Sequence, residues 1–190
     1  MRNVLILASR SPRRAEILTQ AGIPFEQRTA GEADEAPRPG ERPSNYVQRL
    51  AADKARLVEP GPNEIVLGAD TTVAIEDQIL GKPANAEDAR RMLRLLSGRT
   101  HEVLTGVALR SREQMVTDVA STKVWFLELT EEEIDAYVAG GEPLDKAGAY
   151  GIQGLAAKFI PRIEGCYFNV VGLPVAVVYR RLREMKRSPP

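Results

Sequence analysis

Four short segments of the chain gather polar side chains that the surrounding hydrophobic pattern does not require. The first, residues 9–14, follows an apolar run at residues 4–8 and contains Ser9, Ser11, Arg13 and Arg14. Ser11 followed by Pro12 predicts a helix N-terminus, whose free N–H groups and positive dipole end attract anions. Arginines beside it can bind phosphate oxygens in a bidentate way, so the segment favours a phosphate site. The alternative is a capped helix with a solvated basic first turn, although arginines there oppose the helix dipole.

The second segment places Asp70 and Thr71 directly after a predicted buried strand at residues 65–69. Open α/β sheets bind ligands at strand ends, and a carboxylate there can act as a general base or hold a metal ion. Lys82 lies on the return strand of a predicted hairpin that turns near Asp77, which brings Lys82 to the same end as Asp70. Taken alone, an aspartate with a simple salt bridge explains these residues equally well.

The third segment is an acidic loop whose Asp34 or Glu35 could supply oxygen ligands to a metal ion. Lys54 belongs with it as a cation on an otherwise apolar helix face, where a snorkelling lysine is the alternative. The fourth segment, residues 146–154, has three glycines around Gln153, whose amide offers the donor and acceptor that recognise one edge of a base. Loops of both kinds are more often simply solvated.

The chain has one cysteine, Cys166, and one histidine, His101. An internal disulfide and a multi-cysteine metal site are therefore excluded, and a reducing, cytoplasmic compartment is expected. A metal ion would be held by carboxylates, which favours Mg²⁺ or Mn²⁺. We expect His101 to make a structural hydrogen bond and Cys166 to lie buried in a last strand. A P-loop is absent, because no Gly-Lys-Ser or Gly-Lys-Thr occurs at the required spacing.

Strand and helix patterns are interleaved along the chain, which predicts an α/β fold with a mixed sheet. The predicted strands lie at residues 4–8, 65–69, 73–75, 79–83, 103–109, 116–129 and 165–171. Helices are predicted to follow Ser11, to cover residues 46–58, and to follow Asn85, Thr130 and Pro174; Thr130 and Glu133 form a capping box. We expect a single domain over residues 1–190, with a disordered tail at residues 186–190.

Charge and hydropathy exclude further classes of protein. The 26 basic residues balance 26 acidic ones, which argues against a stable complex with nucleic acid. No apolar run is long enough to span a membrane, and the short run at residues 4–8 is followed by arginines rather than by a signal-peptide cleavage site. We expect neither a membrane partner nor export.

Six motifs follow one another in a specific order along the chain. They are Leu-Ala-Ser-Arg-Ser-Pro-Arg-Arg at residues 7–14, Leu-Ala with Lys-Ala at 50–55, Gly-Ala-Asp-Thr at 68–71, Gly-Lys-Pro at 81–83, Leu-Ser-Gly with Thr-His at 96–101, and Gly-Ile-Gln-Gly at 151–154. Together they resemble the Maf family of nucleoside triphosphate pyrophosphatases, from residue 5 to about residue 180. No single motif decides the match, but the ordered set is highly specific.

The resemblance implies hydrolysis of a nucleoside triphosphate between its α and β phosphates. It implies a fold similar to that of the inosine triphosphatases, an elongated mixed sheet with two lobes around a central cleft, in a homodimer. Asp70 resembles the family's proton acceptor, and Glu35 with Asp70 would hold Mg²⁺ or Mn²⁺. The other implied site residues bind phosphates or line the pocket: Ser9, Ser11, Arg13, Arg14, Lys54 and Lys82.

The implied substrates are dTTP and UTP, in standard or modified form. Arg13, Thr71 and Gln153 are similar to the branch that hydrolyses these nucleotides, whereas the branch acting on 7-methyl-GTP differs after the aspartate and lacks the glutamine. Ala156 and Cys166 depart from the family pattern, which expects glycine and a small polar residue there. The alternative function is a nucleotide-binding regulator of cell division or septum formation that acts through a protein partner.

Overall fold

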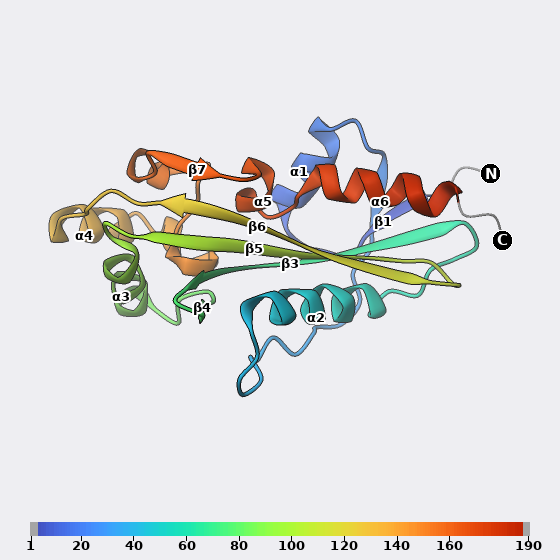
Figure 1. The fold of residues 1–190 in the computed structure, drawn as a ribbon, viewed down its shortest axis with the longest axis horizontal. Coiled ribbons are helices and arrows are strands. Elements are labelled where there is room, and N and C mark those ends of the chain that lie inside the picture. Colours follow the sequence, from blue (N-terminus) through green and yellow to red (C-terminus); the bar gives the residue numbers. More distant parts are fainter. Residues whose placement is uncertain (1–3, 188–190) are drawn as a thin grey trace.

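A long mixed β-sheet runs the length of the molecule (Figure 1). The computed structural model describes residues 4–187, and within them seven strands form the sheet in the order β2-β1-β3-β5-β6-β7, with β4 paired to β3. The strands are β1 (Val4–Leu7), β2 (Phe25–Gln27), β3 (Glu64–Ile75), β4 (Gln78–Leu80), β5 (Thr100–Arg110), β6 (Met115–Trp125) and β7 (Arg162–Glu164).

The central strand β3 changes partners along one of its edges. β1 pairs with it in parallel as far as Leu7 opposite Leu67, and β4 pairs with it antiparallel from Val73 opposite Leu80. Between these pairings, residues 68–72 of β3 have no strand neighbour on this edge among the described residues, while β5 pairs along the other edge. The gap leaves the middle of the sheet open to a ligand.

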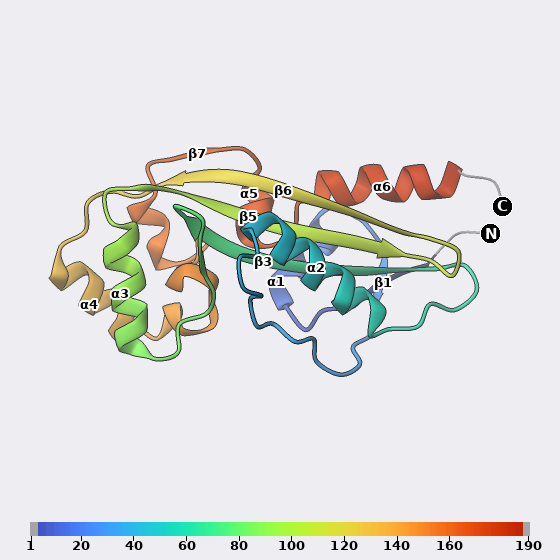
Figure 2. The ribbon, with the colours of Figure 1, turned by 60° about the horizontal axis from the view of Figure 1, so that its bottom comes forward.

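Helices cover both faces of this sheet. They are α1 (Pro12–Gln20), α2 (Pro43–Arg56), α3 (Ala86–Leu96), α4 (Glu131–Ala139), α5 (Tyr167–Val171) and α6 (Val175–Arg187), with short 3₁₀ segments η1 (Glu142–Asp145), η2 (Ala147–Ala149) and η3 (Leu155–Phe159). Helix α2 lies on one face, opposite α1, α5 and α6, whereas α3 and α4 pack at the far end of the sheet from α6 (Figures 1 and 2).

Two separate apolar cores on one face of the sheet produce two lobes. In the first, α1 and α6 cover alternate residues of β1, β3 and β5, among them Leu7, Leu67 and Val107. In the second, α3, α4 and the 3₁₀ segments pack on Val73 and Ile75, further along β3. Because strand side chains alternate between faces, the intervening residues pack instead under α2. The expected elongated mixed α/β fold with two lobes is confirmed.

Helix α2 lies unusually close to the sheet, because two glycines face it. A Cβ at Gly68 of β3 would stand 2.2 Å from the carbonyl oxygen of Ala51, and a Cβ at Gly106 of β5 would stand 2.1 Å from that of Val47. Only glycine permits backbone to approach backbone at this distance. The contact places Lys54, in the last turn of α2, above the middle of β3.

Local capping signals give the helix starts correctly. Ser11 is the N-cap of α1 with Pro12 in its first turn, and the side chain of Asn85 caps α3 by accepting from the Asp88 N–H. The capping box of Thr130 with Glu133 is present at the start of α4. These predictions hold because a cap depends on residues within one turn of each other.

Four boundary predictions are wrong. Asp70 lies within β3 rather than after a strand, because β5 continues to pair beyond the end of β1. The segment predicted as a strand to residue 129 leaves the sheet at Trp125, where its partner β5 begins. Lys186 and Arg187 belong to α6, because residues 180–187 are strong helix formers around the buried Leu182. The rest of the expected disordered tail, residues 188–190, lies outside the described residues.

The fourth concerns residues 165–171, predicted as a last strand, which instead contain the short helix α5. Buried Asn169 donates from its amide to the Val103 carbonyl oxygen and to Thr122 Oγ1, which holds the segment across β5 and β6. A short apolar run does not distinguish strand from helix by its periodicity. Cys166 is consequently the half-buried N-cap residue of α5 and not a buried strand residue.

Candidate active site

A cavity of about 1120 Å³ opens at the unpaired edge of β3, between the two lobes. Its size is sufficient for a nucleotide. All the residues predicted for the site line it, although they come from separate elements: Ser9, Ser11, Arg13, Arg14, Glu35, Lys54, Asp70, Thr71, Lys82 and Gln153. Asp34, the other candidate for the metal, is not among the lining residues.

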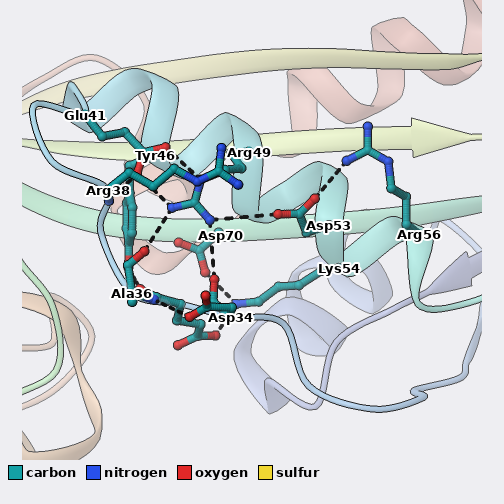
Figure 3. Close-up of polar contacts among 11 residues, drawn as sticks. Asp34, Ala36, Arg38, Glu41, Tyr46, Arg49, Asp53, Lys54, Arg56 and Asp70 are labelled. Carbon is teal, nitrogen blue, oxygen red and sulfur yellow. Dashed lines mark hydrogen bonds and ion pairs between the residues drawn. The ribbon is translucent and has the colours of Figure 1, made fainter.

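Asp70 is the most deeply placed acid of the cavity, with 8% of the residue exposed. Lys54 Nζ donates to its Oδ1 at 2.6 Å, and Figure 3 shows the two side chains pointing toward each other. Burial raises the pKa of Asp70, and the charges of Lys54 and Arg14 oppose that rise without cancelling it. A carboxylate with a raised pKa is a better proton acceptor than an ordinary aspartate.

Lys54 joins a second carboxylate to the first. Its Nζ lies 2.6 Å from Oε1 of Glu35 as well as 2.6 Å from Oδ1 of Asp70, so the two acids meet at one ammonium group. Burial raises the pKa of Glu35, but the hydrogen bond from Lys54 outweighs it, and the pKa lies below its ordinary value. Both carboxylates therefore face one point in the cavity.

Arg14 brings a positive charge into the cavity and forms no ion pair with any other described residue. Within residues 4–187, its guanidinium donates to neutral acceptors, the Gly172 carbonyl oxygen at 2.9 Å, Ser9 Oγ at 3.1 Å and Thr71 Oγ1 at 3.3 Å. Burial lowers the pKa of Arg14, which expresses the cost of a desolvated charge. An anion that enters the cavity would supply the missing partner.

The other predicted cavity residues make few side-chain contacts within the part of the chain that the structure describes. There, Arg13 has one long ion pair, with Asp145 at 3.8 Å, and the side chain of Ser11 makes no capping hydrogen bond. Lys82 has no ion pair within residues 4–187, and the register of β4 carries it level with Thr71. Gln153 is exposed and belongs to the glycine-rich segment at residues 146–154. These groups are placed to contact a ligand rather than one another.

His101 lies outside this cavity and has the structural role expected of it. Its Nε2 shares a 2.7 Å hydrogen bond with the hydroxyl of Tyr150, and its ring packs edge-to-face against Phe126. Burial lowers the pKa of His101 to about 4, so the ring is neutral at pH 7. A proton carrier at neutral pH would need a pKa close to 7.

Comparison with known proteins agrees with this arrangement. The profile of the family described as Maf-like protein matches residues 4–185. Two proteins named dTTP/UTP pyrophosphatase, from Bacillus cereus strains B4264 and G9842, are 53% and 54% identical over 181 residues, which is 95% of this chain and 94% of each relative. The chain belongs to the Maf family.

Two solved structures share the fold of this Maf protein at low sequence identity. A HAM1 protein from Coxiella burnetii has a TM-score of 0.54 and 13% identity, with 98% of this chain and 100% of that chain covered. The Ham1 protein of Staphylococcus aureus has a TM-score of 0.56 and 11% identity, with 96% and 100% covered. At this identity the likeness concerns the fold alone, which agrees with the expected resemblance in fold.

The donor set of the Maf cavity suits a hard divalent cation. Glu35 and Asp70 supply two carboxylates, and within residues 4–187 no cluster of three or more acidic, histidine or cysteine side chains forms a complete cage. Mg²⁺ prefers such a site, because it is commonly bound by one or two carboxylates together with substrate phosphates and water. Lys54 occupies the point between the carboxylates and would have to move for both to reach a metal ion.

Sequence reasoning missed the residues that hold this site in place. Helix α2 contributes Tyr46 and Arg49, which bind the backbone of the acidic loop, and Gly172 supplies the carbonyl oxygen that orients Arg14. Glu142 accepts from the Leu155 N–H at 3.0 Å and so anchors the segment beside Gln153. Of these supporting residues, Arg49 alone has a feature visible in the sequence, because it lies five residues before Lys54 in the same predicted helix.

Proposed function

We propose that this Maf protein hydrolyses dTTP and UTP to the nucleoside monophosphate and pyrophosphate. The observation that carries the proposal is the position of Asp70, a buried acid in contact with Lys54 in a cavity lined by further cations. The relatives named dTTP/UTP pyrophosphatase support the choice of substrate. No comparison supports the alternative of a regulator of cell division that acts through a protein partner.

The cavity residues account for binding of the triphosphate. Arg13, Arg14, Lys54 and Lys82 come from three different parts of the chain and surround one volume, where they balance several phosphate charges. The free N–H groups at the start of α1 add donors beside Ser11. The net charge of the whole chain is zero, so this positive potential is local to the cavity.

Asp70 performs the proton transfer of the proposed reaction. A water molecule forms a bond to phosphorus while the phosphoanhydride bond between the α and β phosphates breaks, and the proton of that water passes to the Asp70 carboxylate. Mg²⁺ or Mn²⁺ bound by Glu35 and Asp70 would neutralise charge that develops on the phosphate oxygens. Lys54 contacts both carboxylates and favours their ionised forms before a ligand arrives.

Base recognition falls to Gln153. Its amide offers a donor and an acceptor that complement the O4 and N3–H edge of thymine or uracil, and Thr71 and Arg13 line the same cavity. Such pairing does not distinguish a standard pyrimidine from one modified elsewhere on the ring. Removal of modified pyrimidine nucleotides is therefore part of the proposal.

The assembly and compartment belong to the proposal as well. A cytoplasmic compartment agrees with the lone cysteine, and the homodimer is what the family resemblance implies. Among the described residues, no helix has both the length and the apolar character needed to cross a bilayer. Light scattering coupled to gel filtration tests the dimer directly, because a mass of one chain in solution would contradict it.

The test of the proposed function is pyrophosphate release from a panel of nucleoside triphosphates with Mg²⁺ or Mn²⁺. We expect dTTP and UTP to be turned over fastest and 7-methyl-GTP far more slowly. Asp70→Asn should lower kcat by roughly 10²–10⁴-fold, the usual contribution of a general base. Asp77→Asn, at the exposed turn of the same hairpin, is the matched control and should retain full activity. Wild-type turnover by Asp70→Asn would refute the role of Asp70, and absence of turnover in the wild type would refute the function.

A further inference from the structure

The loop that carries Glu35 is bound to α2 through its backbone. Tyr46 donates from its hydroxyl to the carbonyl oxygen of Glu35 at 2.9 Å. Arg49 donates to the carbonyl oxygens on either side, those of Asp34 at 3.3 Å and Ala36 at 3.1 Å (Figure 3). Three consecutive carbonyl groups of the loop therefore accept hydrogen bonds from two side chains of one helix.

Arg49 is itself held in place by Glu41, at the end of the same loop. Its Nε and one terminal nitrogen donate to the two carboxylate oxygens, both at 2.7 Å. Only 14% of the Arg49 side chain and 9% of the Glu41 side chain are exposed. The hydrogen bonds from Arg49 lower the pKa of Glu41 to about 2. A bidentate, largely buried pair of this kind fixes the guanidinium plane, which a lysine cannot reproduce.

Fixing the backbone determines which acid enters the cavity. The carboxylate of Asp34 accepts from the Ala36 N–H at 3.0 Å and closes a local turn, so it is engaged within the loop. Glu35 instead reaches Lys54, which lies on the same helix as Arg49 and contacts Asp70. Helix α2 thus sets both the loop that carries Glu35 and the ammonium group between the two acids.

We propose that Arg49 is a positioning residue that, with Glu41 and Tyr46, holds Glu35 toward Asp70. Residues 29–42 have no helix or strand, and ordering such a loop is costly in conformational entropy. Without Arg49 the loop samples other conformations and the two carboxylates cease to face one point. The inference rests on the proposed function, in which these two carboxylates bind the divalent metal.

The first experiment compares Arg49→Lys with a matched control on the same helix. Arg49→Lys keeps the charge and removes the planar fork, and we expect kcat/KM to fall roughly 10–100-fold with a higher Mn²⁺ concentration for half-activation, as for other residues that orient metal ligands. Arg56→Lys is the control, because Arg56 is exposed and, among residues 4–187, its side chain pairs only with Asp53. Equal activity in the two variants would overturn the proposal.

A double-mutant cycle with Glu35 separates positioning from a general structural effect. If Arg49 acts through Glu35, Arg49→Lys should have little further effect on kcat in a Glu35→Gln background. Tyr46→Phe, which removes only the hydrogen bond to the Glu35 carbonyl, should show a smaller loss with the same dependence on Glu35. Losses that add fully on the Glu35→Gln background would overturn the proposal.

Two measurements do not depend on turnover. Hydrogen–deuterium exchange should show faster uptake in residues 29–42 of Arg49→Lys, with β3 and β5 unchanged, and electron paramagnetic resonance of Mn²⁺ alone should show weaker binding than to the wild type. Unchanged exchange in the loop overturns the positioning role, even in a protein without pyrophosphatase activity. If the loop exchanges faster in Arg49→Lys than in the wild type but the wild type releases no pyrophosphate, the proposed function is refuted and the restraint of the loop by Arg49 still holds.

Discussion

The charge of Lys54 controls the protonation of Asp70, because its ammonium group is the cation in contact with that carboxylate. The pKa of Asp70 is raised by burial and held down in part by Lys54, so Lys54→Gln should raise it further. A base must be ionised to accept a proton. As the pH is lowered, the residual activity of Lys54→Gln should therefore begin to fall at a higher pH than the activity of the wild type does. The kcat/KM profile against pH measures this shift.

The control for this prediction is Lys82→Gln. Lys82 is a cation of the same cavity, but it does not contact Asp70. The variant should lower affinity for the triphosphate while leaving the acidic limb of the profile where it is in the wild type. Equal displacement of the limb in both variants would show that overall cavity charge, and not the contact with Lys54, sets the pKa of Asp70.

Residue types predicted the cavity well but not its supports. Serines, arginines and Asp70 stood out because their types and spacing had no role in the apolar pattern, and the structure brings them together. The choice between Asp34 and Glu35 depended on the path of the loop, which Arg49 fixes through backbone carbonyls. A side chain that binds carbonyl oxygens leaves no pattern in the sequence, because every residue supplies a carbonyl.

At the scale of elements, the closeness of α2 to the sheet determines the geometry of the site. Gly106 pairs with Asp70 across β3 and β5, and a Cβ there would collide with the backbone of Val47. Gly106→Ala should therefore push α2 outward, lower the free energy of unfolding by about 1–3 kcal/mol, and reduce activity by moving Lys54 away from Asp70. Urea denaturation and turnover of the same preparation measure both effects.

Gly81→Ala serves as the stability control for this prediction, because a Cβ at Gly81 meets nothing within 4 Å and its φ is not positive. Its free energy of unfolding should lie within about 0.5 kcal/mol of the wild type, the usual range for substitutions without a buried contact. If Gly106→Ala were equally stable, the sheet would tolerate a displaced α2, and the glycine contact would not hold the helix in place.

Elements with local signals were predictable, and elements fixed by distant contacts were not. Asn85 and Thr130 marked helix starts because a cap is complete within one turn. Helix α5 was predicted as a strand because its conformation depends on Asn169, whose partners lie on β5 and β6. The position of Asp70 within β3 likewise depends on its pairing with Gly106 of β5, which lies far along the sequence.

At the scale of the whole molecule, the sheet order separates two cores and places the cavity between them. The order β2-β1-β3-β5 cannot be derived from alternating strand and helix patterns, because several orders satisfy them; the expected two-lobed form came from the family resemblance. The chain is neutral as a whole, yet cations from separate elements line the cavity at the open edge of β3. The lobes share the long strands β3 and β5, so loss of either core should disrupt the other.

Because the two lobes are coupled in this way, His101, which is buried beside the core of the second lobe, is a probe of the stability of the whole chain. Its pKa is lowered to about 4 from an ordinary value of 6.5, so the unfolded chain binds a proton in this interval and the folded chain does not. The contribution of neutral His101 to the free energy of unfolding is fully present above pH 6.5. It decreases by about 3 kcal/mol as the pH falls toward 4. His101→Gln keeps a polar partner for Tyr150 but does not titrate, so its free energy of unfolding should fall less over this interval. Urea denaturation of both proteins from pH 7.5 to 4 measures the difference, and parallel pH dependences would show that His101 is protonated in the folded protein as readily as in the unfolded one.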